Sequence, residues 1–354
     1  MMKKKLGIIF LTGILSVVLL AGCGADQEEQ SSSGSASEQS TSEASKEKST
    51  SSSSKANLAV NPEDVAKKLE SQENPKFDKE DIRGISVVVD GETVYQMNYT
   101  PRDDKESYLY WDMVTPYAST VVVDTEAMYE LYEMIAGMDL TSGSEEAKDS
   151  VQDMENCDTY ITLNYYEHKD SEEQKEEPNR TATLLIGEQK DGKYYCELKE
   201  YGEKGLWISA DTIDAILQQE PYDLILKIPY VVNVTTVKKV NISYKGKDYT
   251  MTSDNGTYKI NGKKVDASEY QSLYSELMQP MLDGEIEEDF GPEKGREPLI
   301  SIQYIRNMDG AEDYEVNIYS CGDDQYTVSV NGEENFFLVA EDVKTLEKAL
   351  QDAF

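Results

Sequence analysis

Apolar residues recur with two different spacings from residue 85 to the C-terminus. In several short segments apolar and polar residues alternate, as in 85–89 and 161–165, which predicts β-strands with one buried face. In other segments apolar residues stand three and four positions apart, as in 128–135 and 270–277, which predicts helices with one buried face. This part of the chain therefore combines strands and amphipathic helices.

These segments come twice in the same order, which indicates a divergent duplication. Asp124 is the predicted N-cap of a helix in the first copy, and Asp266 with Glu269 forms a variant of the capping box in the second. The difference in residue number between a block of the first copy and its match in the second becomes smaller along the chain. The first copy therefore has extra residues, which we place in loops at 101–106 and 167–180. The matched blocks are 85–91 with 240–246, 124–135 with 266–277, 161–165 with 300–304, and 207–213 with 337–343.

Each copy is expected to contain two strands, a helix, a meander of about four strands and a short capped helix. Dipeptides that favour left-handed turn positions separate the strands. They are Asp90-Gly91, Asp191-Gly192, Asn255-Gly256, Asn261-Gly262, Asp309-Gly310 and Asn331-Gly332. Strands joined by tight turns form antiparallel sheets, so we predict an α+β fold with helices on one face of each sheet. The two units, each with two helices, are assigned to residues 85–226 and 227–354.

The N-terminus has the features of a secretion signal. Three lysines at positions 3–5 precede an apolar or small stretch at 6–21, and a helix of that length reaches only about 24 Å, short of a ~30 Å hydrocarbon core. The junction from Leu20 to Cys23 resembles the lipobox of bacterial lipoproteins. We therefore predict a signal peptide at 1–22, cleavage between Gly22 and Cys23, and lipidation of the Cys23 thiol. An ordinary secretion signal with a chance cysteine is the alternative.

A serine-rich segment follows the predicted anchor. Residues 24–56 include 13 serines and lack aromatic residues, Val, Ile and Leu, so they cannot bury enough apolar area to offset the entropy of ordering. We predict a disordered linker over 23–56 with a reach of about 30 Å, followed by a transition segment at 57–84. That segment includes a predicted helix over 62–69. The linker would hold the body away from the extracytoplasmic face of the membrane.

Charge narrows the choice of partners. The chain has 69 acidic and 34 basic residues and a net charge of −35, which argues against nucleic acid as a partner because nucleic-acid binding depends on Lys and Arg. A hydrophobic share of 38% is still enough for a folded core. The partner that the sequence predicts is the membrane, which the protein would contact through its N-terminal lipid.

Several local motifs also resemble a known family. They are Trp111, Pro116, the helix after Asp124, Leu184-Leu185-Ile186-Gly187, Tyr194-Tyr195 and Gly205-Leu206-Trp207. From about Ile85 to the C-terminus the chain resembles the bacterial lipoprotein family with domain of unknown function 4340. That family has no assigned catalytic residues, so none is carried over. Some members are similar in genomic setting to auxiliary components of ABC transport systems, which implies an accessory role beside a transporter subunit.

Residues that commonly carry chemistry are scarce. The single histidine, His168, lies in a predicted polar loop, which would not hold a catalytic base in a fixed position. Because the chain has only one histidine, the sequence also argues against a transition-metal site. Cys157, Cys196 and Cys321 form no CxxC motif and are expected to be buried or idle thiols rather than a disulfide. We predict no catalytic residues, no metal ligands and no cofactor, and the sequence does not identify a binding residue.

Acidic clusters and tyrosines leave alternatives open. The acids at Glu285, Glu287, Glu288 and Asp289, and at Asp323-Asp324, are interpreted as a solvated face. A carboxylate-based hydrolase acting on glycans and a Ca²⁺-stabilised surface protein are the alternatives. Tyr132, Tyr165, Tyr274 and Tyr304 fall on core-facing positions and are expected to be structural rather than a sugar-stacking platform. The leading hypothesis is a membrane-anchored, extracytoplasmic, non-enzymatic binding or accessory module.

Overall fold

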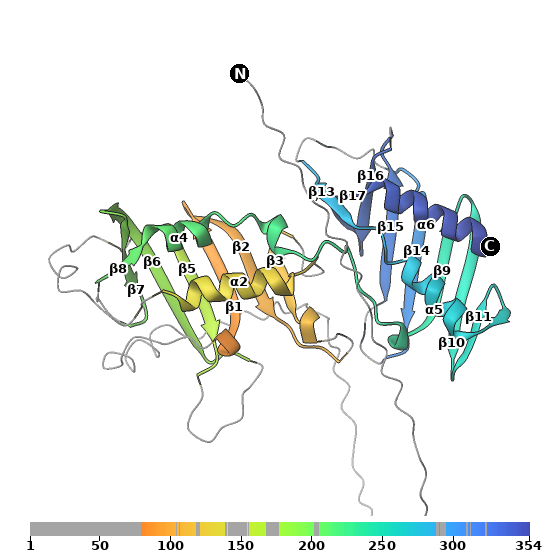
Figure 1. Cartoon of the computed structure of the whole chain (residues 1–354), viewed down its shortest axis with the longest axis horizontal. Helices are drawn as coiled ribbons and strands as arrows, with labels where there is room; N and C mark the ends of the chain where they lie inside the picture. The colour runs from red at the N-terminus through yellow and green to blue at the C-terminus, as the bar shows by residue number, and fades with distance from the viewer. Residues whose placement is uncertain are drawn as a thin grey trace, which may run out of the picture. The chain divides into compact units, whose positions relative to one another are not determined.

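A computed structural model describes residues 79–354 with short gaps, and its chain forms two antiparallel sheets (Figure 1). The gaps are at 104, 106, 118–120, 139, 141–153, 155, 168–176, 202–204, 288–289, 291–294, 309–310, 312 and 323. Four α-helices accompany the sheets within the described part of the chain. The predicted α+β class is confirmed.

The first sheet has eight strands in the order β4-β3-β2-β1-β5-β6-β7-β8. Its strands are β1 (Ile82–Val89), β2 (Glu92–Tyr99), β3 (Trp111–Thr115), β4 (Val121–Val122), β5 (Tyr160–Tyr165), β6 (Arg180–Lys190), β7 (Lys193–Leu198) and β8 (Gly205–Ser209). Strands that follow one another in sequence lie side by side, except that β5 pairs with β1 and not with β4. This is the meander that tight turns predict.

The second sheet has nine strands in the order β12-β11-β10-β9-β14-β15-β16-β17-β13. Its strands are β9 (Val237–Tyr244), β10 (Lys247–Asp254), β11 (Thr257–Ile260), β12 (Lys263–Val265), β13 (Leu282–Glu285), β14 (Ile300–Arg306), β15 (Tyr314–Ser320), β16 (Tyr326–Val330) and β17 (Glu333–Leu338). Without β13, this order repeats that of the first sheet strand for strand. The duplicated architecture is thus confirmed at the level of topology.

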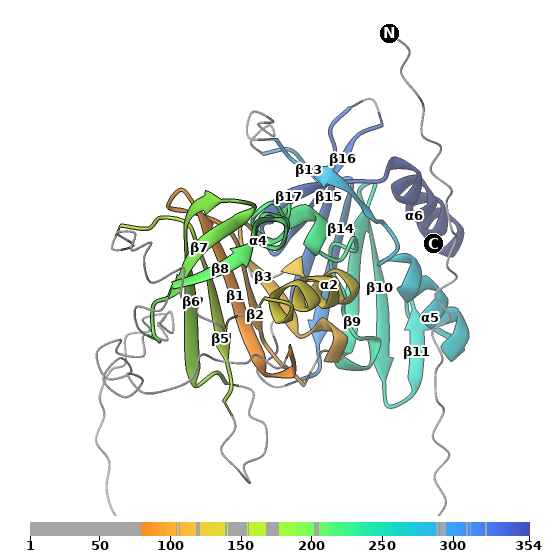
Figure 2. The same ribbon diagram turned by 60° about the vertical axis from the view of Figure 1, so that its left-hand side comes forward.

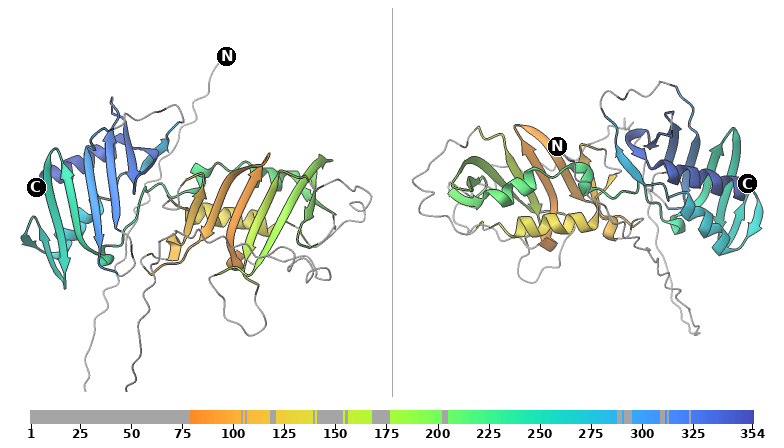
Figure 3. Two further views of the ribbon diagram at one scale, coloured as in Figure 1. Left: turned by 180° about the vertical axis from the view of Figure 1, so that it is seen from behind. Right: turned by 45° about the horizontal axis from the view of Figure 1, so that its top comes forward.

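Two helices lie on one face of each sheet (Figures 1 and 2). They are α2 (Thr125–Ala136) and α4 (Ala210–Leu217) over the first sheet, and α5 (Ala267–Glu276) and α6 (Ala340–Ala353) over the second. The left panel of Figure 3 shows the opposite face of each sheet, which the helices leave uncovered. Four short 3₁₀ helices complete the regular structure: η1 (Lys79–Asp81), η2 (Ser107–Leu109), η3 (Pro221–Leu224) and η4 (Val234–Thr236).

The core of each unit lies between the sheet and its helices. In the first unit, cross-strand partners Val87 and Tyr95 are fully buried and share this layer with Leu131 of α2. In the second, Ile242 is buried in the same way, together with Tyr270 of α5. Each fully buried side chain of this kind stabilises the fold by about 1.5–3 kcal/mol. The spacing of apolar residues in the sequence therefore identifies the layer that holds each unit together.

The expected element list differs from the structure in three respects. Strands β3 and β4 in the first copy, and β11, β12 and β13 in the second, were not predicted. All five are two to five residues long, too short to show a clear alternation. Helix α6 has 14 residues and is not short, because its apolar positions continue to Leu346 and Leu350. The predicted caps of α4 and α6 are wrong, since Ser209 and Val339 at their N-caps make no side-chain capping bond.

Turn residues behave as the sequence predicts. Both residues of five predicted dipeptides have positive φ: Asp90-Gly91, Asp191-Gly192, Asn255-Gly256, Asn261-Gly262 and Asn331-Gly332. Lys245-Gly246 adopts the same conformation without an Asn or Asp signal. The predicted turn at Asp309-Gly310 lies outside the described residues.

The predicted N-terminal features, including the signal peptide, the linker and the helix over 62–69, lie outside the described residues. Strand β1 begins at Ile82, three residues before the predicted start of the first unit. Within the part of the chain that the structure describes, no helix is both long enough and apolar enough to span a membrane.

Candidate functional site

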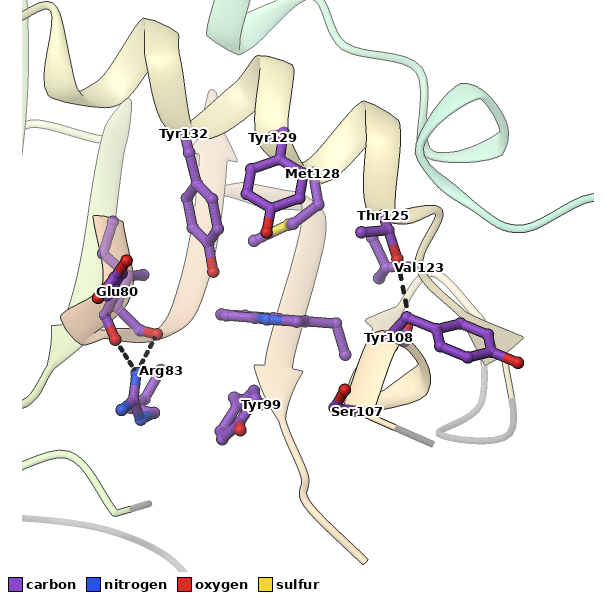
Figure 4. Close-up of a pocket in the computed structure, with 12 residues that line it drawn as sticks. Glu80, Arg83, Tyr99, Ser107, Tyr108, Val123, Thr125, Met128, Tyr129 and Tyr132 are labelled. Carbon is purple, nitrogen blue, oxygen red and sulfur yellow. Dashed lines mark hydrogen bonds between the residues drawn. The ribbon is translucent and has the colours of Figure 1, made fainter. Parts of the chain in front are cut away.

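A pocket of about 540 Å³ lies in the first unit beside helix α2 (Figure 4). Pockets of 300–1,000 Å³ are typical of small-molecule sites. The lining residues come from η1 and the start of β1, the end of β2, η2, the start of β3 and the first two turns of α2. They are Glu80, Ile82, Arg83, Tyr99, Ser107, Tyr108, Trp111, Val123, Thr125, Met128, Tyr129 and Tyr132.

The antiparallel register brings the strand contributions to one end of the sheet. Gly84 of β1 pairs with Asn98 of β2, so the start of β1 lies beside the end of β2. Tyr99 in turn pairs with Trp111 at the start of β3. Residues separated by almost thirty positions in sequence thus meet at the same edge, as adjacent antiparallel strands require.

Arg83 lies in the pocket wall on the same face of β1 as the buried Ile85 and Val87, and the pairing of β1 with β5 is irregular at this point. Ile82 pairs with Tyr165, and Gly84 pairs with the preceding residue, Asn164, so β1 has one extra residue at Arg83. Such a β-bulge interrupts the alternation of side chains, and here it lets the neighbouring Ile82 join the core together with Ile85. Ile82, Arg83 and Gly84 are consequently all buried, although only Arg83 would lie on the face of Ile85 and Val87 if the alternation were strict.

Arg83 is held firmly at this position. Its Nη1 donates hydrogen bonds to the backbone oxygens of Glu80, at 2.6 Å, and Ile82, at 2.9 Å (Figure 4). The guanidinium also lies over the ring of Tyr99, 4.9 Å from its centroid. Only 9% of Arg83 is exposed. The pocket therefore has a permanently charged group whose position is set by the backbone and an aromatic ring.

The aromatic residues surround the space instead of stacking in parallel. The rings of Tyr99 and Trp111 lie 5.8 Å apart at an angle of 57°, and those of Trp111 and Tyr132 lie 5.9 Å apart at 74°. Tyr129 meets Tyr132 at 6.3 Å and 73°. Tilted and edge-to-face pairs of this kind are favourable and form adjacent walls. Burial raises the pKa of Tyr132, partly offset by the nearby Arg83 charge, so its hydroxyl stays protonated at neutral pH.

The loop between β2 and β3 forms the rim of the pocket. Thr125 at the start of α2 donates a hydrogen bond to the backbone oxygen of Tyr108, at 2.9 Å. Behind the rim, the buried carboxylate of Asp112 accepts bonds from the Thr100 hydroxyl, at 2.5 Å, and from the Lys105 ammonium, at 2.7 Å. These contacts tie the loop to both the helix and the sheet.

The second unit has buried tyrosines at the corresponding end of its sheet. Its sheet also has an extra residue at this end, between the pairs Arg306–Val237 and Ile305–Lys239, and Arg306 is buried there. Four tyrosines that are at most 3% exposed pack against one another in this unit: Tyr230, Tyr270, Tyr274 and Tyr304. A two-residue turn at Asn255-Gly256 replaces the long loop that carries Tyr108 in the first unit. The loop insertion in the first copy therefore accompanies the open pocket.

The residues predicted to carry chemistry do not gather at this pocket. Gly22, Cys23 and His168 lie outside the described residues. Cys157, Cys196 and Cys321 are free thiols, as expected. Burial raises the pKa of the Cys196 thiol, so this cysteine is a poor nucleophile.

The acidic clusters are likewise apart from the pocket. Glu285 accepts a hydrogen bond from the Tyr117 hydroxyl, and Asp324 forms an ion pair with Lys344 at 2.8 Å. Glu288, Asp289 and Asp323 lie outside the described residues. Among all residues that the structure describes, no group of three His, Cys, Asp or Glu side chains is placed so that it could hold a metal ion.

The four tyrosines predicted to face the core are all buried in it. Tyr165, Tyr274 and Tyr304 are buried in the core. Tyr132 is also largely buried, but it lines the pocket. The sequence signal that could have revealed the site is the density of aromatic residues in and beside the extra loop of the first copy, Tyr99, Tyr108, Tyr110 and Trp111.

No family model matches the chain, and no curated protein or solved structure is detectably similar to it. The resemblance to the lipoprotein family with domain of unknown function 4340 therefore stays a prediction. The candidate site is defined by its geometry alone.

Proposed function

We propose that this chain is a membrane-anchored, extracytoplasmic lipoprotein that binds a small molecule and does not catalyse a reaction. The observation that carries the binding role is the pocket beside α2, with its aromatic walls and the buried Arg83. Apolar and aromatic walls with one or two polar groups held in place are typical of ligand-binding sites.

The location rests on the sequence. Charged residues, an apolar stretch, small residues and Cys23 follow one another in the order that a lipoprotein signal requires. Diacylglycerol on Cys23, with an amide-linked fatty acid such as palmitate, would give stable anchoring where one chain would be marginal. An accessory role beside a transporter subunit is part of this proposal through the family resemblance.

The composition of the pocket favours binding over glycan hydrolysis. Hydrolysis of a glycosidic bond requires two carboxylates about 5–9.5 Å apart, one on each side of the bond. The residues that line this pocket include a single carboxylate, that of Glu80. The remaining lining groups can hold a ligand but do not supply the missing acid or base.

Tryptophan fluorescence can test the binding role because the chain has only two tryptophans. In a Trp207→Phe variant, Trp111 in the pocket is the remaining indole, and its emission should change when a ligand from a library of sugars, amino acids and organic acids binds. Thermal shift of the same samples provides an independent readout, since a ligand that binds only the folded state raises the melting temperature.

The matched control is Trp111→Phe, which leaves Trp207 outside the pocket lining. Ligands that change Trp111 emission should leave the emission of this control unchanged. If no compound changes Trp111 emission or the melting temperature, the binding proposal is wrong. Equal emission changes in the Trp207→Phe and Trp111→Phe variants would also contradict the proposal that the ligand binds in this pocket.

A further inference from the structure

We infer that the ligand of this pocket is an organic anion built on a single ring, with its anionic group directed toward Arg83. This inference rests on the proposed function, since it names the class of ligand that the same site would bind. It follows from three properties of the pocket: the shape of its aromatic walls, the burial of its cation and the exposure of its acid.

The aromatic walls favour a compact ring. Trp111 contacts Tyr99 at an angle of 57° and Tyr132 at 74°, so the three rings turn around a space instead of forming one flat platform. Met128 and Ile82 add aliphatic surface to the same lining. Both an aromatic ring and the C–H face of a sugar ring can contact such walls.

The buried cation favours an anionic group. Arg83 keeps its charge at any physiological pH, and its burial reduces the screening of that charge by water and salt. Its Nη1 is oriented by two backbone oxygens, which fixes the guanidinium before any ligand binds. A carboxylate placed beside a preorganised guanidinium forms charge-assisted hydrogen bonds, which are stronger than neutral ones.

The same geometry argues against a cationic ligand. Aromatic walls alone would suit a quaternary ammonium group. Here Arg83 already lies over the Tyr99 ring at 4.9 Å, so a second cation would be repelled at short range. The acid in the lining, Glu80, is exposed to solvent, where water screens its charge more effectively than that of Arg83.

Two sources share this ligand chemistry: an aromatic carboxylic acid and a sugar acid. The test therefore measures binding of benzoate and glucuronate, and of their uncharged amides, benzamide and glucuronamide, to the Trp207→Phe protein by Trp111 fluorescence. We expect at least one acid to bind at least tenfold more tightly than its amide, and the acid that does so identifies the source. Choline serves as the cationic probe and should not bind.

Charge variants at the two ionisable side chains sharpen the test. Arg83→Lys retains the charge but loses the planar group, and we expect it to reduce the preference for the acid over its amide at least fivefold. Glu80→Gln keeps the backbone oxygen that Arg83 contacts and should strengthen binding of the acid. Circular dichroism and melting temperature establish that both variants are folded.

The outcomes separate this inference from the proposed function. If amides bind as tightly as acids, or if choline binds in preference, the anionic class is wrong while binding in the pocket stands. If neither acids nor amides bind but a library compound that is not a single-ring anion changes Trp111 emission, the class is wrong and the proposed function is upheld. A complete absence of binding would overturn both.

Discussion

Gly205 shows how tightly side chains pack on the face of the first sheet opposite the helices. A methyl group added at Gly205 would lie 2.5 Å from a ring carbon of Tyr195 on the neighbouring strand. Tyr195 is 2% exposed, donates a 2.6 Å hydrogen bond to Glu197 and contacts Trp207 edge to face. The ring therefore has little freedom to move aside, and only glycine fits at position 205.

We expect Gly205→Ala to lower the free energy of unfolding by about 1–3 kcal/mol, as overpacking of a buried layer does. Chemical denaturation of the full chain measures this change. Gly284→Ala is the matched control, because Gly284 also lies in an edge strand, has no positive φ and has no atom within 4 Å of the added methyl. A similar loss in both variants would contradict the assigned role of Tyr195.

At the scale of secondary structure, α2 forms one wall of the pocket and is held at its N-terminus by Asp124. The carboxylate accepts hydrogen bonds from the backbone N–H groups of Glu126, at 2.8 Å, and Ala127, at 3.1 Å. The backbone N–H of Asp124 donates to Leu224, which ties the start of the helix to η3. The cap thus sets both the first turn of α2 and the position of Thr125 and Met128 in the pocket.

We expect Asp124→Ala to destabilise the protein by about 1 kcal/mol and to weaken binding of any ligand that changes Trp111 emission. Denaturation and fluorescence titration measure the two effects. Asp266→Ala is the matched control, because Asp266 caps α5 through the Glu269 N–H, away from the pocket. It should lower stability and leave the affinity for the ligand unchanged. Equal effects of the two variants on affinity would show that α2 does not position the pocket.

The Asp266 cap also predicts a pH dependence. Hydrogen bonds from the Glu269 N–H and the Ser268 hydroxyl lower the pKa of this carboxyl group below its usual value. Because this pKa is lower in the folded state than in the unfolded chain, the ionised Asp266 cap stabilises the fold above the usual pKa of Asp. This contribution to the free energy of unfolding is lost as the pH falls through the lowered pKa.

At the scale of the whole molecule, the proposed function depends on the N-terminal cysteine. We expect the full chain expressed in a bacterium to incorporate a palmitate analogue and to fractionate with membranes. Cys23→Ala should abolish the labelling. Cys157→Ala is the control and should keep it, because Cys157 belongs to the folded part. Labelling that persists in Cys23→Ala would rule out lipidation at this position.

The local structure of this protein could be read largely from its sequence. Alternation of apolar residues located most of the longer strands, and the turn at Asp90-Gly91 adopts the left-handed conformation that its residues favour. Asp124 caps the helix that was predicted to follow it. The repeated order of these signals also predicted the duplication, since each signal acts over only a few residues and survives divergence.

The pocket was decided by tertiary structure. Arg83 is held beside Tyr99 because β1 pairs with β2 in this register, and its burial depends on the pairing of β1 with β5, about eighty residues away. Tyr132 reads as a core residue from helical spacing, and only the extra loop at Tyr108 leaves open space beside it. In the second unit the residue that matches Met128 is the larger, fully buried Tyr270. Local patterns thus determined the elements, whereas strand register and loop length, which depend on contacts between distant residues, decided that one copy has an open pocket.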